Sequence, residues 1–259
     1  MKKSKLLILI LILMLVFLLG PFLVIMLASF GSEALMKFPP KGFSLNWYDK
    51  VLNIRMFRTT FWISLNVGLA ATGTALLLGI PVSYALVRFR FLGKNVIELL
   101  FSSPVIVPGM VIGFSLLRFF IYVGNIPIII GLYLGHTAIL LPYTIRVVSA
   151  SLRNFDPAVE EAAISLGSSR LFTFLSVILP NIRAGVVAAL ILAFITSFNN
   201  VPVSLFLTGP GVATLPIQML VYMEYYFDPT IAALSSILIL VTILIVQTAE
   251  KLLRISQYV

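Results

Sequence analysis

The sequence predicts an all-α integral membrane protein, and three observations lead to this fold class. Hydrophobic residues occupy 60% of the 259 positions, charged residues occupy only 10%, and the mean hydropathy is +1.11. These values lie far from those of a soluble domain. The apolar residues also gather in six long stretches. Because a hydrocarbon layer of roughly 30 Å needs about 20 apolar residues per helix, the whole chain, 1–259, is predicted to be a single membrane domain.

Each apolar stretch is predicted to cross the bilayer as one helix. The six predicted spans are Leu6–Phe30, Thr60–Val87, Val96–Val123, Gly131–Ala150, Ala184–Leu207 and Ile231–Glu250. The first span follows three lysines, as the core of a signal peptide would. Its apolar run is longer than the usual ~7–15 residues of such a core, so we expect it to be retained.

Lysine and arginine positions predict the orientation. If the spans alternate across the membrane, 12 of the 18 basic residues fall on one side, which carries both termini, the Arg88–Lys94 loop and the Arg146–Arg183 stretch. The positive-inside rule then places both termini in the cytoplasm. This rule also explains the net charge of +9, so we expect no nucleic acid partner. The chain has no cysteine, which excludes disulfides, thiolate metal sites and a cysteine nucleophile.

The 151–183 segment, between spans four and five, is too patterned for a simple connection. Asp156 and Pro157 predict the start of a short helix, because aspartate caps free amides and proline suits the first helical position. Gly167 is predicted to end this helix in a left-handed conformation. The helix carries two acids, which favour its positive end, and two alanines, which permit close approach of another surface: Glu160, Glu161, Ala162 and Ala163.

A second helix is predicted from Ser168 to Leu179, closed by Pro180. One apolar face is expected on it, formed by Leu171, Phe172, Leu175 and Ile178. This pattern also fits an amphipathic helix lying in the lipid headgroups. The paired acids of the first helix favour a protein partner instead, because an anionic membrane face would repel them.

The spacing of Glu161, Ala162, Ala163 and Gly167, followed by "VILP" at 177–180, resembles the "EAA" signature of the membrane subunits of bacterial ABC importers. Val177 stands where that family usually has isoleucine. The resemblance implies a type I ABC importer permease fold in the inner membrane, with a cytoplasmic coupling helix that docks on an ATPase. The residues expected to take part in this coupling are Glu160, Glu161, Ala162, Ala163, Gly167 and Ser168.

The same resemblance implies the partners: a cytoplasmic ABC ATPase dimer, a second permease that is a different homologous chain, and an external solute-binding protein. The chain contains no G-x-x-x-x-G-K-[ST] motif, so ATP and Mg²⁺ are expected on the partner ATPase. We expect no catalytic residue, metal or cofactor in this chain itself. The competing hypotheses are an ion-coupled secondary transporter and a membrane-embedded enzyme. Both would need buried ionisable groups, and spans one to five offer only Glu98 as an acid.

Polar side chains inside spans are costly, so they are candidates for the substrate pathway. They are Asn66, Arg118, His136, Thr196, Asn199 and Asn200. Arg118 fits a snorkelling contact equally well. His136 has no nearby ligand partner in the sequence, so we expect it to hydrogen-bond between helices rather than to bind metal. The G-x-x-x-G spacings at 109–113 and 131–135 fit either intrachain packing or pairing with a second permease.

The run "SFNNVPVSLFLTGPGVATLPIQ", 197–218, resembles the spermidine/putrescine group of importer permeases, which typically have S-F-D-D followed by T-G-P and L-P. Here Asn199 and Asn200 replace the two acids. A polyamine cation is best accompanied by carboxylates, so the amides also leave room for amino acids, aminophosphonates or other small polar organic solutes. They also fit a role as hydrogen bonds between helices. Glu224 and Asp228 are the remaining acidic candidates near the outer mouth, and they also fit ordinary loop charges.

Overall fold

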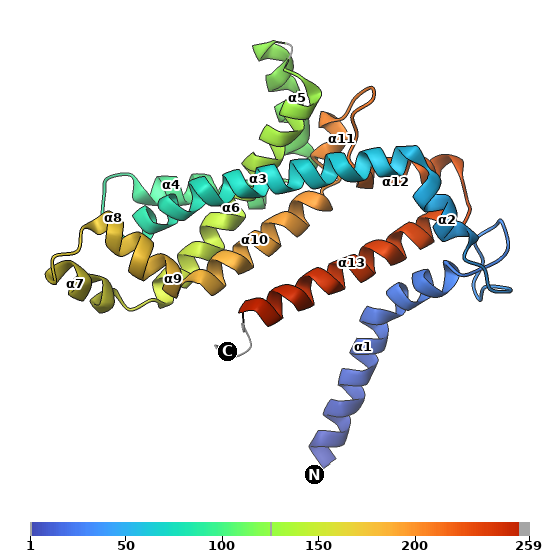
Figure 1. Ribbon diagram of the computed structural model, residues 1–259, viewed down its shortest axis with the longest axis horizontal. Helices are drawn as coiled ribbons and strands as arrows, with labels where there is room; N and C mark the ends of the chain where they lie inside the picture. The colour runs from blue at the N-terminus through green and yellow to red at the C-terminus, as the bar shows by residue number, and fades with distance from the viewer. Residues whose placement is uncertain (1, 125, 254–259) are drawn as a thin grey trace. The chain divides into compact units, whose positions relative to one another are not determined.

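The computed structural model describes residues 2–124 and 126–253, and the regular structure of this part is helical (Figure 1). The all-α prediction is therefore confirmed. The longer helices are α1 (Lys2–Ala28), α3 (Arg55–Arg88), α4 (Lys94–Ile106), α5 (Gly109–Val123), α6 (Ile128–Asn154), α10 (Arg183–Phe198), α12 (Leu215–Tyr225) and α13 (Thr230–Leu253). The shorter ones are α2 (Asn46–Asn53), α7 (Pro157–Ser165), α8 (Arg170–Thr173), α9 (Leu179–Asn181) and α11 (Ser204–Leu207). Arg254, which the orientation argument used, lies outside the described residues.

The helices divide into two compact units. In unit 1, described over 2–59 and 218–253, α13 packs against α1 and α2. In unit 2, described over 60–124 and 126–217, α6 is the central helix and packs against α4, α5, α10 and α11. Twelve of the 27 residues of α6 are buried, which is why its sequence is apolar on more than one face.

Four helices, α1, α3, α6 and α13, contain stretches long and apolar enough to cross a membrane. A fifth candidate span consists of two helical pieces, Arg170–Asn181 and Arg183–Phe198, which meet at an angle of 73°. The described residues thus contain four or five candidate spans. The count of six remains a prediction.

The predicted third span, Val96–Val123, is not one continuous helix. Helix α4 ends at Ile106, and α5 begins at Gly109 after Pro108, whose ψ of 132° is not helical. Proline explains the break, because it lacks an amide hydrogen and disfavours helical geometry in the residue before it.

The predicted fifth span, Ala184–Leu207, is also wrong in its boundaries. Helix α10 stops at Phe198, and the chain forms the separate turn of α11 only from Ser204. Pro202 interrupts the backbone hydrogen bonding between them. The stretch that follows, between the predicted fifth and sixth spans, contains the eleven-residue helix α12.

Glycines allow the helices of unit 2 to approach each other closely. A Cβ atom placed on Gly113 would lie 2.9 Å from the carbonyl oxygen of Pro202 and 3.0 Å from the Cα of Val203. A Cβ on Gly135 would lie 2.4 Å from Cδ1 of Leu207. Both G-x-x-x-G spacings therefore serve packing within the chain, with α5 and α6 closing on the 202–207 stretch.

We expect Gly113→Ala to destabilise the chain by ~1–3 kcal/mol, because its methyl group would meet backbone atoms that cannot move aside cheaply. Gly73→Ala is the matched control. It lies in the interior of α3 with nothing within 4 Å of its Cβ position, so it should be neutral or slightly stabilising. Thermal unfolding of both variants in detergent measures the difference. Equal stability of the two variants would contradict the packing role of Gly113.

Candidate functional site

Helix α7 begins and ends as the sequence predicts. The carboxylate of Asp156 accepts a hydrogen bond from the amide of Ala158 at 2.9 Å, which caps the first turn. At the other end Gly167 has φ +94°, and the amide of Ser168 donates to the carbonyl of Ala163 at 3.1 Å. This is the left-handed cap that favours glycine. A Cβ on Gly167 would meet no atom within 4 Å, so backbone conformation rather than space restricts the position.

The two adjacent glutamates of α7 point in different directions. Glu160 is only 8% exposed, and its carboxylate accepts hydrogen bonds from Nε of Arg88 at 2.9 Å and from the hydroxyl of Tyr84. Arg88 also donates to the carbonyl of Phe155 at 3.1 Å. Glu161 is exposed and makes no hydrogen bond or ion pair with the described residues. Glu160 therefore fastens α7 to the end of α3, and Glu161 is the acid that a partner could contact.

The second helix of the segment begins at Arg170, two residues later than predicted, and continues past Pro180 to Asn181. The prediction that Pro180 closes it is wrong. Residues 174–178 form a wider π-helical turn just before the proline, which relieves the clash that a proline ring makes with a normal α-helical turn. The chain breaks instead at Ile182, where it bends into α10.

The prediction that four apolar residues share one face of this helix is also wrong. Ile178 is fully buried, whereas Leu171, Phe172 and Leu175 are exposed. The π-helical turn changes the angular spacing between Leu175 and Ile178, so the four residues do not share one face. Leu166, in the turn after α7, is 90% exposed. The segment therefore presents apolar side chains that none of the described residues covers.

His136 lies in the core of unit 2 and joins three helices. Its Nδ1 is 2.7 Å from the hydroxyl oxygen of Ser197 on α10, and its Nε2 is 3.0 Å from that of Ser204 on α11. The prediction of hydrogen bonding between helices is confirmed. Among the described residues, no three side chains of the metal-binding types gather closely enough to hold an ion.

The end of α10 distinguishes the two neighbouring asparagines. Asn199 is the C-cap of α10 and its side chain is exposed. Asn200 is partly buried, and its Oδ1 accepts a hydrogen bond from the amide of Val203 at 3.0 Å. Asn200 thus stabilises the turn before α11, while the amide of Asn199 is available at a helix end that carries partial negative charge.

The other polar candidates of unit 2 lie on three helices. Asn66 is exposed on α3, and Thr196 is partly buried on α10. These two helices are close there, since a Cβ on Gly68 would lie 3.2 Å from Cε2 of Phe194. Arg118 is exposed on α5 and makes no hydrogen bond or ion pair with the described residues. No contact brings Arg118 to the other candidates within that part of the chain.

Glu224 and Asp228 belong to unit 1 and differ in their surroundings. Glu224 is exposed on α12. Asp228 accepts a hydrogen bond from Nζ of Lys50 at 2.5 Å and further bonds from the hydroxyl of Tyr222 and the amide of Thr230. Desolvation alone would raise the pKa of Asp228, but these hydrogen bonds hold it below its ordinary 3.8. The hydrogen bond to Asp228 raises the pKa of Lys50 above its ordinary 10.5. Asp228 is therefore part of a structural clamp.

Some of these arrangements can be predicted from the sequence and others cannot. The caps of α7 can be recognised from neighbouring residues. Arg88 and Tyr84, however, are 72 and 76 residues from Glu160, and no local sequence pattern indicates that they bind it. Lys50 is likewise 178 residues from Asp228.

We expect the Lys50–Asp228 clamp to give unit 1 a stability plateau between roughly pH 4 and 10. The contribution of Asp228 is present above its unfolded pKa of 3.8 and is lost as the pH falls through its lower folded pKa. The contribution of Lys50 is present below 10.5 and is lost as the pH rises through its higher folded pKa. In thermal unfolding measured as a function of pH, Asp228→Asn should remove the loss of stability at both the acid and the alkaline edge of this plateau. Glu33→Gln, which removes the exposed pair with Lys37, is the control and should leave the profile unchanged.

Comparison with known proteins places these features in a family. Residues 71–254 match the family described as the binding-protein-dependent transport system inner membrane component. The putrescine transport system permease protein PotI of Escherichia coli strain K12 is 30% identical over 239 residues, covering 90% of this chain and 85% of that protein. The spermidine/putrescine transport system permease protein PotC of Haemophilus influenzae is 30% identical over 214 residues, covering 83% of each.

A solved structure shows the same fold. It is a bacterial ABC transporter involved in the import of the acidic polysaccharide alginate, and its matched chain superposes with a TM-score of 0.75, at 18% sequence identity, over 96% of both chains. The family match spans well over half of the sequence, includes the 151–183 segment, and agrees with the resemblance carried by Glu161 to Pro180. The chain therefore belongs to the family of inner membrane permease subunits of binding-protein-dependent ABC importers.

Proposed function

We propose that this permease forms the translocation pathway for a small polar organic solute of the polyamine or related amino-compound class, which an external binding protein delivers. Subunits of this family lack ATPase activity of their own and assemble with ATPase subunits and a binding protein. The finer assembly proposed is a pair of ATPases and a second, homologous permease, with both termini of this chain in the cytoplasm.

The proposed class of solute rests on the structure at the end of α10. Asn199 is exposed there, at a helix C-terminus whose free carbonyls attract cations even without a carboxylate. An amine cation can therefore be accompanied by helix carbonyls and a neutral amide. The names of PotI and PotC, which refer to putrescine and spermidine, agree with this class.

The 151–183 segment is the proposed contact with the ATPase. Glu161, Ala162, Ala163, Gly167 and Ser168 form its docking surface, together with the exposed Leu166. Glu160 has a different role in this proposal. It lies inside the chain and joins α7 to α3 through Arg88, so a movement of α7 driven by ATP is passed to a membrane helix.

We expect Glu161→Ala to weaken ATPase binding about tenfold, as truncation of a central interface residue does, without changing the stability of the chain. Glu160→Ala should instead lower the stability of the chain by about 2 kcal/mol, because it leaves the mostly buried Arg88 without its counter-charge. Co-purification with the ATPase and thermal unfolding of the isolated chain separate the two effects.

Gly167→Val tests the coupling role at the end of α7. Valine should strain the left-handed cap by ~1–2 kcal/mol. Gly167→Asn is the matched control, because asparagine tolerates that conformation. The valine variant should hydrolyse ATP without transport. Normal assembly and transport by the valine variant would refute the coupling role.

The solute class is tested with the importer reconstituted in vesicles together with its ATPase and binding protein. Putrescine and spermidine should stimulate ATP hydrolysis, whereas a neutral sugar and an oxyanion should not. Asn199→Asp should improve the apparent affinity for putrescine several-fold, because it adds a carboxylate at the exposed helix end. Asn200→Asp is the comparison, since that side chain is engaged with Val203. Stimulation by the oxyanion alone would refute the amine class.

A further inference from the structure

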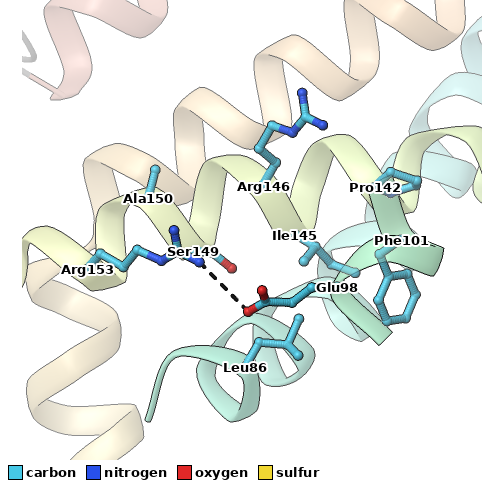
Figure 2. A pocket seen from close by; sticks show the side chains of 9 residues that line it. All are labelled: Leu86, Glu98, Phe101, Pro142, Ile145, Arg146, Ser149, Ala150 and Arg153. Atoms are coloured by element: carbon cyan, nitrogen blue, oxygen red, sulfur yellow. Dashed lines mark ion pairs between the residues drawn. The ribbon is translucent and has the colours of Figure 1, made fainter. Parts of the chain in front are cut away.

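A pocket of about 280 Å³, with charged side chains in its lining, opens on one face of α6 in unit 2 (Figure 2). Pro142, Arg146, Ser149 and Arg153 lie three to four residues apart and therefore line a single stripe of this helix. Glu98 of α4 faces the stripe from the opposite side. The pocket is separate from the residues considered so far for coupling and for the solute.

The charges in this pocket do not balance. Two arginines and one carboxylate line it, and the ion pair between Arg153 and Glu98 is 3.8 Å long with side chains that are 65% and 37% exposed, which makes it weak. In Figure 2 the guanidinium of Arg146 points away from Glu98. Arg146 has no hydrogen bond or ion pair with any described residue. The hydroxyl of Ser149 points toward Glu98 in Figure 2, but it is buried without a hydrogen-bond partner, and the residue is only 7% exposed. A buried hydroxyl without a partner is costly, so the pocket suits a ligand with negative charge and hydrogen-bonding oxygens.

An apolar cavity of about 530 Å³ adjoins this pocket. Leu86 and Phe101 line both spaces. The remaining lining of the cavity is entirely apolar and comes from α3, α4 and the turn between them: Val82, Ala85, Phe91, Ile97 and Leu100. A ligand that occupies both spaces is therefore charged at one end and hydrocarbon at the other.

We propose that this composite pocket is a binding site for an anionic phospholipid of the phosphatidylglycerol type. Its phosphate pairs with Arg153 and with Arg146, whose exposed side chain turns toward the pocket on binding. Its headgroup hydroxyls donate to Glu98 and exchange hydrogen bonds with Ser149, and part of an acyl chain enters the adjoining cavity. Basic pockets between membrane helices are suited to such headgroups, and the net positive charge selects against zwitterionic lipids.

The position of the site suggests what the lipid does. Arg153 is one residue from the end of α6, and Phe155, two residues further, is held by Arg88, which also holds Glu160. A bound lipid would therefore fix the end of α6 from which the 151–183 segment departs. It acts as a structural ligand at the base of that segment.

The test uses the purified full-length chain in a neutral detergent, titrated with phosphatidylglycerol, phosphatidylethanolamine or inorganic phosphate and followed by native mass spectrometry and thermal unfolding. Phosphatidylglycerol should bind at least tenfold more tightly than phosphatidylethanolamine. The double variant Arg146→Gln, Arg153→Gln should lose this preference. Arg90→Gln, which removes an exposed arginine outside both cavities, is the matched control and should keep it.

Two further arms make the result decisive. Ala85→Phe fills the apolar cavity without changing any charge, so it should weaken phosphatidylglycerol binding while the variant still unfolds cooperatively. Inorganic phosphate at the same concentration should neither displace the lipid nor stabilise the chain. The proposal is overturned if the double arginine variant binds phosphatidylglycerol as the unmodified chain does, or if inorganic phosphate replaces the lipid.

Discussion

Close approach between helices is the constraint on which the rest of unit 2 depends. In a bilayer, apolar side chains gain little by leaving lipid for protein, so helices associate through small residues and a few buried hydrogen bonds. Gly79 packs against Thr144, Gly113 against the backbone of Pro202 and Val203, and Gly185 against Ser151. His136 adds hydrogen bonds to α10 and α11. The helix breaks at Pro108 and Pro202 are therefore held in place by packing, and the break at Pro202 leaves Asn199 and Asn200 at the end of α10.

The cost of burying polar groups also explains why the two adjacent glutamates of α7 differ in exposure. A carboxylate can be buried only with partners, and Glu160 has both Arg88 and Tyr84. Its neighbour Glu161 has none in the described part of the chain and lies at the surface. The residue that resembles the family signature is thus the exposed one, while the residue beside it connects the surface helix to a membrane helix. Chemically identical side chains have opposite surroundings because successive helical positions face different directions.

Neutral amides at the end of α10 do not exclude a cationic solute, because helix carbonyls supply negative potential there. The fold itself carries no information about the solute, since a likeness of comparable coverage exists to a transporter of an acidic polysaccharide. Selectivity must therefore come from individual side chains and helix ends. In our proposal this role falls to Asn199 and not to Asp228, whose carboxylate is already engaged by Lys50, Tyr222 and Thr230.

The sequence by itself determined the membrane class, most helix positions and both caps of α7, because hydropathy, Asp156 and Gly167 act over a few residues. The tertiary structure alone decided which glutamate is buried, which asparagine is engaged, and that Pro180 lies within a helix rather than at its end. These outcomes depend on partners such as Arg88, 72 residues from Glu160, or on a π-helical turn that no local pattern marks. Local geometry can be inferred from neighbouring residues, whereas a contact between distant residues exists only once the helices have packed.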